Sequence, residues 1–179
     1  MKSHSRVAII GGGIMGVSLL YHLTKEGWND IILLEKGELT SGSTWHAAGQ
    51  CPHFVGSYNA AKIHNYSNKL YQELEKETGQ STGWHGCGSL RLALKEEDVN
   101  WFHYVKGILD NVGSPVSFVP KEKILDLHPF LKIEDVLCAL YTPEDGHTDP
   151  TGTTNAMAIA ARKAGAEIYR HNRVLEIKN

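Results

Sequence analysis

The sequence predicts an α/β protein in which a parallel βαβ unit is followed by an α+β insertion and then resumes. The β-branched run 6–10 leads through the glycine-rich stretch 11–16 into an apolar helix, and a second β-branched run, Ile31–Leu34, comes next. A strand, a glycine turn, a helix and a strand in this order favour a right-handed βαβ unit. Amphipathic helices and short strands then alternate as far as residues 149–150, where another helix is expected to begin.

The remaining elements follow from hydrophobic periodicity and from turn residues. Residues 40–56 are rich in Gly, Ser and Thr and are expected to form a loop with at most one short helical turn. Asp149 and Pro150 supply an N-cap and a first-turn proline for the last helix. Amphipathic spacing predicts helices, and alternating or continuous apolar runs predict strands. The expected helices are one ending near residue 25, then 59–78, 96–111, 121–127 and 151–164; the expected strands are 6–10, 31–34, 89–94, 116–119, 137–141, 167–169 and 174–177.

In the helix expected at 59–78, the apolar residues at helical spacing are Ile63, Tyr66, Leu70 and Leu74. We therefore expect these four side chains to form its buried face.

Composition excludes several classes of protein. The 179 residues are 41% hydrophobic and 21% charged, which is typical of a globular protein. The net charge is -2 and no run of Lys or Arg stands out, so we expect no nucleic-acid partner. The three cysteines, Cys51, Cys87 and Cys138, are odd in number and far apart, and no CxxC, HxxxH or HExxH spacing occurs. Neither a disulfide framework nor a metal site is therefore expected, and a reducing compartment fits best.

Residues 7–24 contain no charged side chain and superficially resemble a signal peptide or a membrane span. The glycines inside this run, and the strand that follows at Ile31, favour a buried strand and a buried helix instead. We therefore expect no membrane span and a cytoplasmic location, or the mitochondrial matrix in a eukaryote, although no transit peptide is present.

Gly11, Gly13 and Gly16 match the dinucleotide-binding fingerprint G-x-G-x-x-G. The first glycine permits a tight turn, the second lets the backbone approach a pyrophosphate, and the third lets helix and strand pack closely. Glu35, after the second strand, can accept hydrogen bonds from ribose hydroxyls and disfavours a 2′-phosphate. The pattern leaves both NAD and FAD open, and its structural alternative is a glycine turn beside a surface glutamate.

The segment after Glu35 favours FAD. Residues 39–49 read LTSGSTWHAAG, and further motifs are LEK at 34–36, GSLR at 88–91 and DGHTDP at 145–150. With the glycine turn, these motifs resemble the dimethylglycine/sarcosine dehydrogenase family of FAD-dependent, D-amino acid oxidase-like enzymes, whose members are considerably longer.

The resemblance implies a Rossmann-type FAD-binding domain interrupted by an α+β insertion and truncated at the C-terminus. Residues 1–56 would form the βαβ unit and the flavin loop, and residues 57–148 the insertion, as part of a substrate domain. Residues 149–179 would return to the FAD-binding domain and leave it incomplete.

The resemblance also implies roles for individual residues. Ile14 and Met15 would lie against the pyrophosphate, and Glu35 with Lys36 would hold the adenosine ribose. Val174 would present its backbone to the adenine. The residues expected to wrap the pyrophosphate and the flavin edge are Gly42, Ser43, Thr44, Trp45, His46, Ala47, Ala48 and Gly49.

His46 matches the family histidine to which the flavin 8α-methyl carbon is covalently bound. A neutral imidazole is a good nucleophile near pH 7, and proximity to the flavin would favour the reaction. Considered without the resemblance, His46 is a loop histidine hydrogen-bonded to a phosphate or a carbonyl. Arg91 could pair with a substrate carboxylate, but an arginine on an edge strand is the commoner explanation. No catalytic residue is assigned.

The implied activity is FAD-dependent oxidation of the C–N bond of a small N-methylated amino acid, of the dimethylglycine or sarcosine type. A hydride would pass to flavin N5, and oxygen or an electron-transfer flavoprotein would accept the electrons. Folate is implied only for a C-terminal module outside these residues. Two alternatives remain: a catalytically silent regulatory subunit, and an NAD-dependent Rossmann dehydrogenase in which residues 42–49 have no role.

Overall fold

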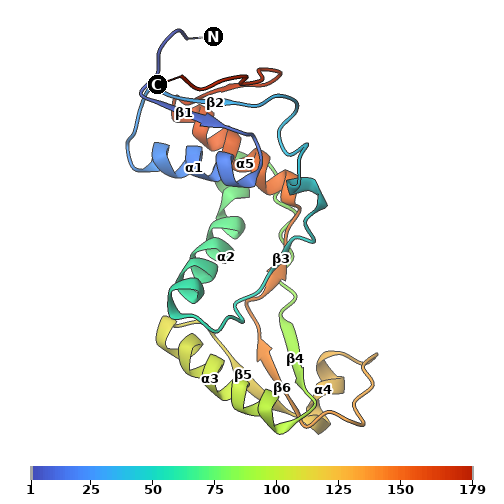
Figure 1. Cartoon of the computed structure of the whole chain (residues 1–179). Helices are drawn as coiled ribbons and strands as arrows, with labels where there is room; N and C mark the ends of the chain where they lie inside the picture. The colour runs from blue at the N-terminus through green and yellow to red at the C-terminus, as the bar shows by residue number, and fades with distance from the viewer. Residues whose placement is uncertain (1, 179) are drawn as a thin grey trace. The chain divides into compact units, whose positions relative to one another are not determined.

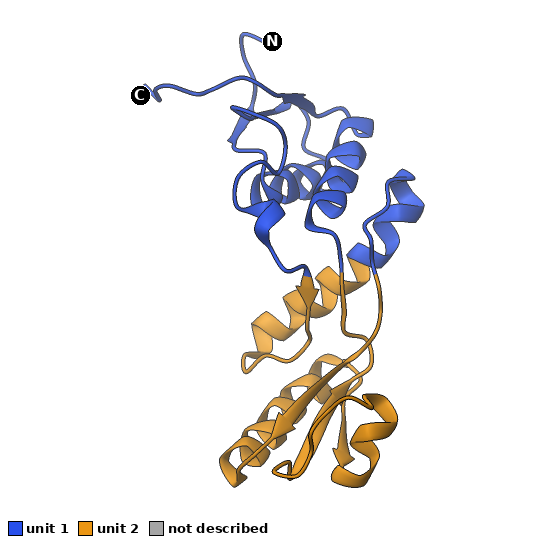
Figure 2. Cartoon of the chain, turned by 90° about the vertical axis from the view of Figure 1, so that its right-hand side faces the viewer, with its two compact units in different colours: residues 1–49, 71–84, 148–179 blue, residues 50–70, 85–147 orange. Residues whose placement is uncertain are grey.

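The computed structural model describes residues 2–178, and the chain divides into two compact units (Figure 2). Unit 1 is 1–49, 71–84 and 148–179, and unit 2 is 50–70 and 85–147. The sequence assigned residues 71–84 to the insertion, whereas they belong to unit 1. The functional domain assignments 1–56, 57–148 and 149–179 stay predictions.

Unit 1 contains a parallel sheet with β2 (Ile31–Leu34) between β1 (Val7–Ile10) and β8 (Glu167–Tyr169). Helices α1 (Ile14–Lys25) and α5 (Pro150–Lys163) pack beside each other on one face of this sheet (Figure 1). Burial of apolar side chains between helices and sheet stabilises the unit. Its fully buried side chains include Val17, Leu20, Tyr21, Ile31, Leu33, Ala156 and Met157.

Helix α5 begins where the sequence predicted. The Asp149 carboxylate accepts hydrogen bonds from the backbone N–H groups of Thr151, at 3.2 Å, and Gly152, at 2.8 Å. Pro150 occupies the first helical position, where no N–H is needed. The predicted N-cap is therefore confirmed.

Unit 2 contains an antiparallel sheet with β6 (Cys138–Thr142) between β4 (Ser89–Ala93) and β5 (Ser117–Pro120). Helices α3 (Glu96–Val112) and α4 (Lys121–Leu127) also belong to the unit. A separate two-stranded ribbon joins β3 (Gln50–Cys51) to β7 (Gly146–His147) in antiparallel pairing.

Helices α3 and α4 cover opposite faces of this sheet. Successive residues of a strand point to opposite faces. Leu140 packs in a cluster with Phe102 of α3, whereas Ala139 packs in a cluster with Ile124 of α4. The sheet is therefore buried on both sides.

Helix α2 (Tyr58–Thr78) contributes residues to both units. Leu70 and Leu74 are buried as predicted, but Ile63 and Tyr66 are 64% and 48% exposed. The buried positions nearer the start of the helix are Ala61 and Asn68. The prediction was wrong there because buried Asn68 donates a hydrogen bond to the Cys51 carbonyl oxygen at 2.9 Å, which apolar periodicity cannot reveal.

The strand predicted at 174–177 is wrong, because residues 172–178 form no strand. β8 ends at Tyr169, and His171 then takes a left-handed backbone conformation with φ 57°. That conformation interrupts the extended chain. The loop predicted at 40–56 contains the expected short helical turn, η1 (Thr44–His46), and also strand β3. Within residues 2–178, no helix is long and apolar enough to cross a membrane.

Candidate dinucleotide-binding site

The glycine turn between β1 and α1 requires glycine at two of its positions, for different reasons. Gly11 has φ +108°, a conformation that favours glycine, and its N–H donates to the Leu34 carbonyl oxygen at 2.9 Å. A Cβ on Gly16 would come within 2.0 Å of the Gly11 carbonyl oxygen. The first and third glycines of the fingerprint are therefore required by the backbone itself.

The N-terminus of α1 is suited to an anion. Its N-cap residue is Gly13, which has no side chain, and its first turn contains no acidic residue. The unpaired N–H groups and the partial positive charge of a helix N-terminus favour phosphate. A Cβ on Gly13 would lie 3.0 Å from the Thr44 hydroxyl oxygen, so glycine at this position lets the helix N-terminus and Thr44 lie close together. These features fit the pyrophosphate of a dinucleotide.

The Glu35 side chain lies against the glycine turn rather than in solvent. It is only 8% exposed, and its carboxylate accepts hydrogen bonds from the N–H groups of Gly12, at 2.6 Å, and Gly37, at 2.8 Å. Each carboxylate oxygen has a second lone pair, so a ribose hydroxyl can still donate to it. The adjacent Lys36 is exposed.

Thr44 joins the predicted flavin loop to helix α1. Its side chain is buried, and its hydroxyl accepts a hydrogen bond from the N–H of Ile14 at 3.0 Å. The next two residues, Trp45 and His46, project outward, with ring centroids 3.7 Å apart and planes inclined by 32°. Met15, Gly42, Ser43, Ala47 and Ala48 are also exposed.

The end of the loop is fixed to the start of α5. Gly49 has φ +70°, and a Cβ there would lie 2.0 Å from the Thr148 carbonyl oxygen. The Thr148 N–H donates to the Gly49 carbonyl oxygen at 2.9 Å, and its hydroxyl donates to the Thr82 carbonyl oxygen at 2.6 Å. Nothing in the sequence indicated that Thr82 and Thr148 hold the end of this loop, although Thr148 lies inside the DGHTDP motif.

The chain after β8 returns along the end of β2. The Glu35 N–H donates to the Tyr169 carbonyl oxygen at 2.9 Å, and the Asn172 N–H donates to the Glu35 carbonyl oxygen at 2.8 Å. Val174, predicted to meet the adenine, follows this segment and is half-buried. The structure thus brings Glu35, the glycine turn and Thr44 together by direct contacts.

Unit 2 contains a buried polar cluster that sequence reasoning missed. His53 and Asp145 are each 2% exposed, and the carboxylate accepts hydrogen bonds from the His53 backbone N–H and from ring Nδ1, both at 2.7 Å. The hydroxyls of Ser89 and Thr142 also donate to Asp145. Burial raises the pKa of Asp145, but these hydrogen bonds outweigh burial and hold the pKa below its usual value. Burial, with a smaller contribution from Asp145, raises the pKa of the Cys51 thiol to about 11.

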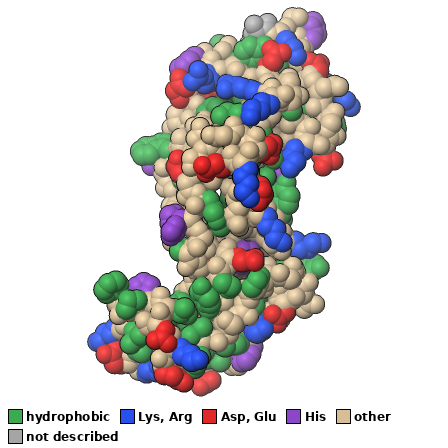
Figure 3. Space-filling view, turned by 180° about the vertical axis from the view of Figure 1, so that it is seen from behind, with side chains coloured by type: hydrophobic (Ala, Val, Ile, Leu, Met, Phe, Trp, Pro, Cys, Tyr) green, Lys and Arg blue, Asp and Glu red, His purple; other side chains and the backbone are tan. Residues whose placement is uncertain are grey.

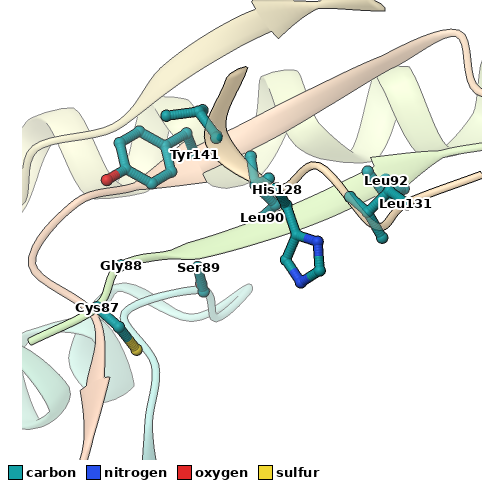
Figure 4. Close-up of a pocket in the computed structure, with 9 residues that line it drawn as sticks. Cys87, Gly88, Ser89, Leu90, Leu92, His128, Leu131 and Tyr141 are labelled. Carbon is teal, nitrogen blue, oxygen red and sulfur yellow. The ribbon is translucent and has the colours of Figure 1, made fainter. Parts of the chain in front are cut away.

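A cavity of about 330 Å³ lies in unit 2, with Cys87 at one end and Leu92 and Leu131 at the other (Figure 4). Apolar side chains gather over this unit on the face shown in Figure 3. Arg91, the candidate for a substrate carboxylate, is exposed, with its guanidinium 5.2 Å from the centre of the Phe54 ring.

The parallel sheet, the glycine turn and the buried acidic residue after β2 define a Rossmann-type dinucleotide-binding unit. A family model described as FAD dependent oxidoreductase matches residues 6–179, and the chain belongs to this family.

Mitochondrial dimethylglycine dehydrogenase of Rattus norvegicus is 48% identical over 164 residues, which cover 92% of this chain and 19% of that protein. The mitochondrial pyruvate dehydrogenase phosphatase regulatory subunit of Mus musculus is 40% identical over 177 residues, covering 99% of this chain and 20% of that protein. The chain thus spans about a fifth of the length of these relatives.

Among solved structures, L-proline dehydrogenase from P. horikoshii matches with a TM-score of 0.87 and 27% identity, over 96% of this chain and 45% of that one. Together with the family match, this likeness confirms the predicted α/β fold class. The predicted resemblance to the dimethylglycine/sarcosine dehydrogenase family is confirmed as well.

Proposed function

We propose that the whole protein is an FAD-dependent oxidoreductase that oxidises the C–N bond of a small N-methylated amino acid. The observation that carries the proposal is the glycine turn held by the buried carboxylate of Glu35. The family match favours FAD over NAD, and the name of the rat relative favours dimethylglycine as the substrate type.

The cofactor would be held by residues of unit 1. The pyrophosphate would lie at the N-terminus of α1 beside Ile14 and Met15, and Glu35 with Lys36 would hold the adenosine ribose. Val174 would present its backbone to the adenine, and residues 42–49 would follow the pyrophosphate to the flavin edge. When bound, FAD supplies a two-electron acceptor for a C–H bond next to nitrogen.

We assign His46 the role of covalent attachment. Its ring is exposed and lies against the ring of Trp45, which is 58% exposed, with the two planes inclined by 32°, so both rings can meet a planar group. Thr44 fixes the start of this turn through Ile14, and Gly49 fixes the loop's end through Thr148. Because both ends are anchored, the imidazole is held in a restricted region, as efficient attachment requires.

The partners proposed for the whole protein are an amine substrate and an electron acceptor, either oxygen or an electron-transfer flavoprotein. A mitochondrial matrix location is proposed if the protein is eukaryotic, because both relatives reported above have mitochondrial names; a cytoplasmic location is proposed otherwise. A folate role is proposed only for a region outside this chain.

An absorbance spectrum of the full-length protein tests the proposal. We expect flavin bands that bleach when dimethylglycine or sarcosine is added anaerobically. A nicotinamide spectrum, or a protein without flavin after expression with excess riboflavin, would contradict it.

A second candidate function is a catalytically silent regulatory subunit. It is favoured by the 40% identity to the phosphatase regulatory subunit over 99% of this chain. This candidate predicts that neither amine bleaches the flavin, whereas dithionite bleaches any flavin that is bound.

A further inference from the structure

Two histidines far apart in the sequence meet in unit 2. His85 and His147 form an isolated antiparallel bridge, in which the His85 N–H donates to the His147 carbonyl oxygen at 2.8 Å and the reverse hydrogen bond is 3.0 Å. Their ring centroids are 5.2 Å apart. Reciprocal backbone hydrogen bonds fix both Cα positions, so the two imidazoles are held as neighbours.

Cys87 lies beside this pair, and its backbone is also anchored. Gly88 donates its N–H to the Asp145 carbonyl oxygen at 2.8 Å and has φ +68°. The segment around Cys87 is therefore fixed on one side by the His85–His147 bridge and on the other by Gly88. One ligand atom from each of His85, Cys87 and His147 lies within 4.8 Å of the other two, and all three residues are exposed.

These three groups have the chemistry of a transition-metal site. Two imidazole nitrogens and one thiolate suit a borderline-soft ion, whereas Ca²⁺ and Mg²⁺ prefer oxygen ligands. Zn–N and Zn–S bonds of about 2.0–2.3 Å require ligand atoms closer together than 4.8 Å. Because all three side chains are exposed, small rotamer changes can supply the contraction without disturbing the core.

We propose that His85, Cys87 and His147 bind one Zn²⁺-like ion, with water as the fourth ligand. Sites with three protein ligands keep an open position of this kind. A cavity of about 250 Å³, lined by Cys87 and His147 together with Gln50 and Gly146, adjoins the cluster and gives a fourth ligand access. The site differs from the expectation drawn from the sequence because it joins the segment 85–87 to His147, and local motif spacing cannot detect such a pairing.

Metal titration of the chelator-treated, reduced full-length protein tests the site. We expect one Zn²⁺ per chain with a dissociation constant of about 1 µM or lower. Co²⁺ should give the thiolate charge-transfer band and the strong visible bands of a tetrahedral site, measured as difference spectra, and excess Zn²⁺ should remove them. Binding should weaken as the pH falls, because the ligands must lose their protons.

Variants of the three ligands test the assignment. Cys87→Ser should abolish the thiolate band, and His85→Gln and His147→Gln should each weaken binding. Removing a group that merely hydrogen-bonds to a metal ligand typically lowers metal affinity about 10–100-fold. Removing a ligand itself should therefore lower Zn²⁺ affinity by at least as much. Cys138→Ser and His128→Gln, which alter a cysteine and a histidine outside the cluster, should bind metal as wild type does.

Thermal unfolding of each variant separates loss of a ligand from loss of the fold. The proposal is overturned if a folded Cys87→Ser protein keeps the thiolate band, or if both histidine variants bind Zn²⁺ as tightly as wild type. A dissociation constant for Zn²⁺ above about 100 µM in wild type would also overturn it, because such a constant corresponds to a binding free energy of little more than 5 kcal/mol. These measurements do not depend on flavin, so they test the metal site whether or not the proposed oxidoreductase activity is found.

Discussion

The carboxylate of Glu35 accepts a hydrogen bond from the backbone N–H of Gly12 at 2.6 Å. The residue expected to hold the ribose therefore also holds the turn expected to hold the pyrophosphate. A Cβ on Gly12 would lie 2.6 Å from the Leu39 side chain and 3.0 Å from Glu35 Cβ, so the contact depends on glycine. Glu35 thus holds the glycine turn in place, and the same side chain forms the proposed ribose subsite.

Replacing Glu35 should accordingly weaken both stability and flavin loading. Glu35→Ala leaves the N–H groups of Gly12 and Gly37 without their carboxylate acceptor, and hydrogen bonds to a charged group contribute about 1.5–3 kcal/mol. We expect urea unfolding to show a loss of that size and FAD incorporation to slow. Glu26→Gln, which alters an exposed residue at the end of α1, serves as the control. Wild-type loading by Glu35→Ala would disprove the ribose assignment.

Gly16→Ala adds only one methyl group, but it should destabilise the glycine turn. The added Cβ would come within 2.0 Å of the Gly11 carbonyl oxygen, and such overpacking costs about 1–3 kcal/mol. We expect lower thermal stability and loss of FAD binding, measured by differential scanning fluorimetry and flavin absorbance. In the same unit, a Cβ on Gly42 meets no atom within 4 Å, so Gly42→Ala should unfold at nearly the wild-type temperature. Equal melting temperatures for the two variants would contradict the steric argument.

Asp145 should make unit 2 sensitive to acid. Its pKa is lowered in the folded state, so the stability it contributes is present above the unfolded-state pKa of about 4 and is lost as the pH falls through the folded-state value. Asp145→Asn weakens the hydrogen bonds from His53, Ser89 and Thr142, and we expect a loss of about 1.5–3 kcal/mol at pH 7.

The measurement is urea unfolding of wild type and variant at several pH values. The difference in unfolding free energy between them should begin to shrink as the pH falls through the unfolded-state pKa of about 4, where the unfolded carboxylate takes up a proton, and should go on shrinking down to the lowered pKa of the folded state. The exposed residue Asp126 gives the matched control Asp126→Asn. A difference that stays constant over this range would show that the charge of Asp145 does not stabilise the fold.

Sequence patterns predicted most of unit 1 because its determinants are local. Three features are each determined by residues only a few positions apart: the glycine turn, the apolar strand Ile31–Leu34 and the Asp149 N-cap. The same reasoning missed the His53–Asp145 pair and the His85–His147 bridge, which join residues distant in the chain. Local periodicity contains no information about such pairing.

Errors in α2 and after β8 have the same origin. Ile63 fits an apolar stripe yet is exposed, while polar Asn68 is buried because a carbonyl oxygen across the unit accepts its hydrogen bond. Residues 174–177 read VLEI and are mostly apolar, as is typical of a strand. The chain had already left the extended conformation at His171. Propensity alone cannot place a strand when the backbone turns away from the sheet.

Covalent attachment of FAD through His46 is the sharpest prediction for unit 1. His46 is exposed in η1, and the centre of its ring lies 3.7 Å from the centre of the Trp45 ring, so truncating it removes little buried surface. His46→Ala should therefore fold normally and bind FAD, but release the flavin on denaturation and turn over more slowly. His171→Ala, which alters another exposed histidine of unit 1, should retain its flavin.

Acid precipitation of the full-length holoprotein distinguishes the two kinds of binding. A covalent link requires the wild-type pellet to stay yellow, and mass spectrometry should find the flavin adduct on the peptide that contains His46. A colourless pellet with all the flavin in the supernatant would reduce His46 to a non-covalent neighbour of the cofactor. Since His171→Ala passes through the same denaturation, loss of flavin from His46→Ala alone would locate the bond at that ring.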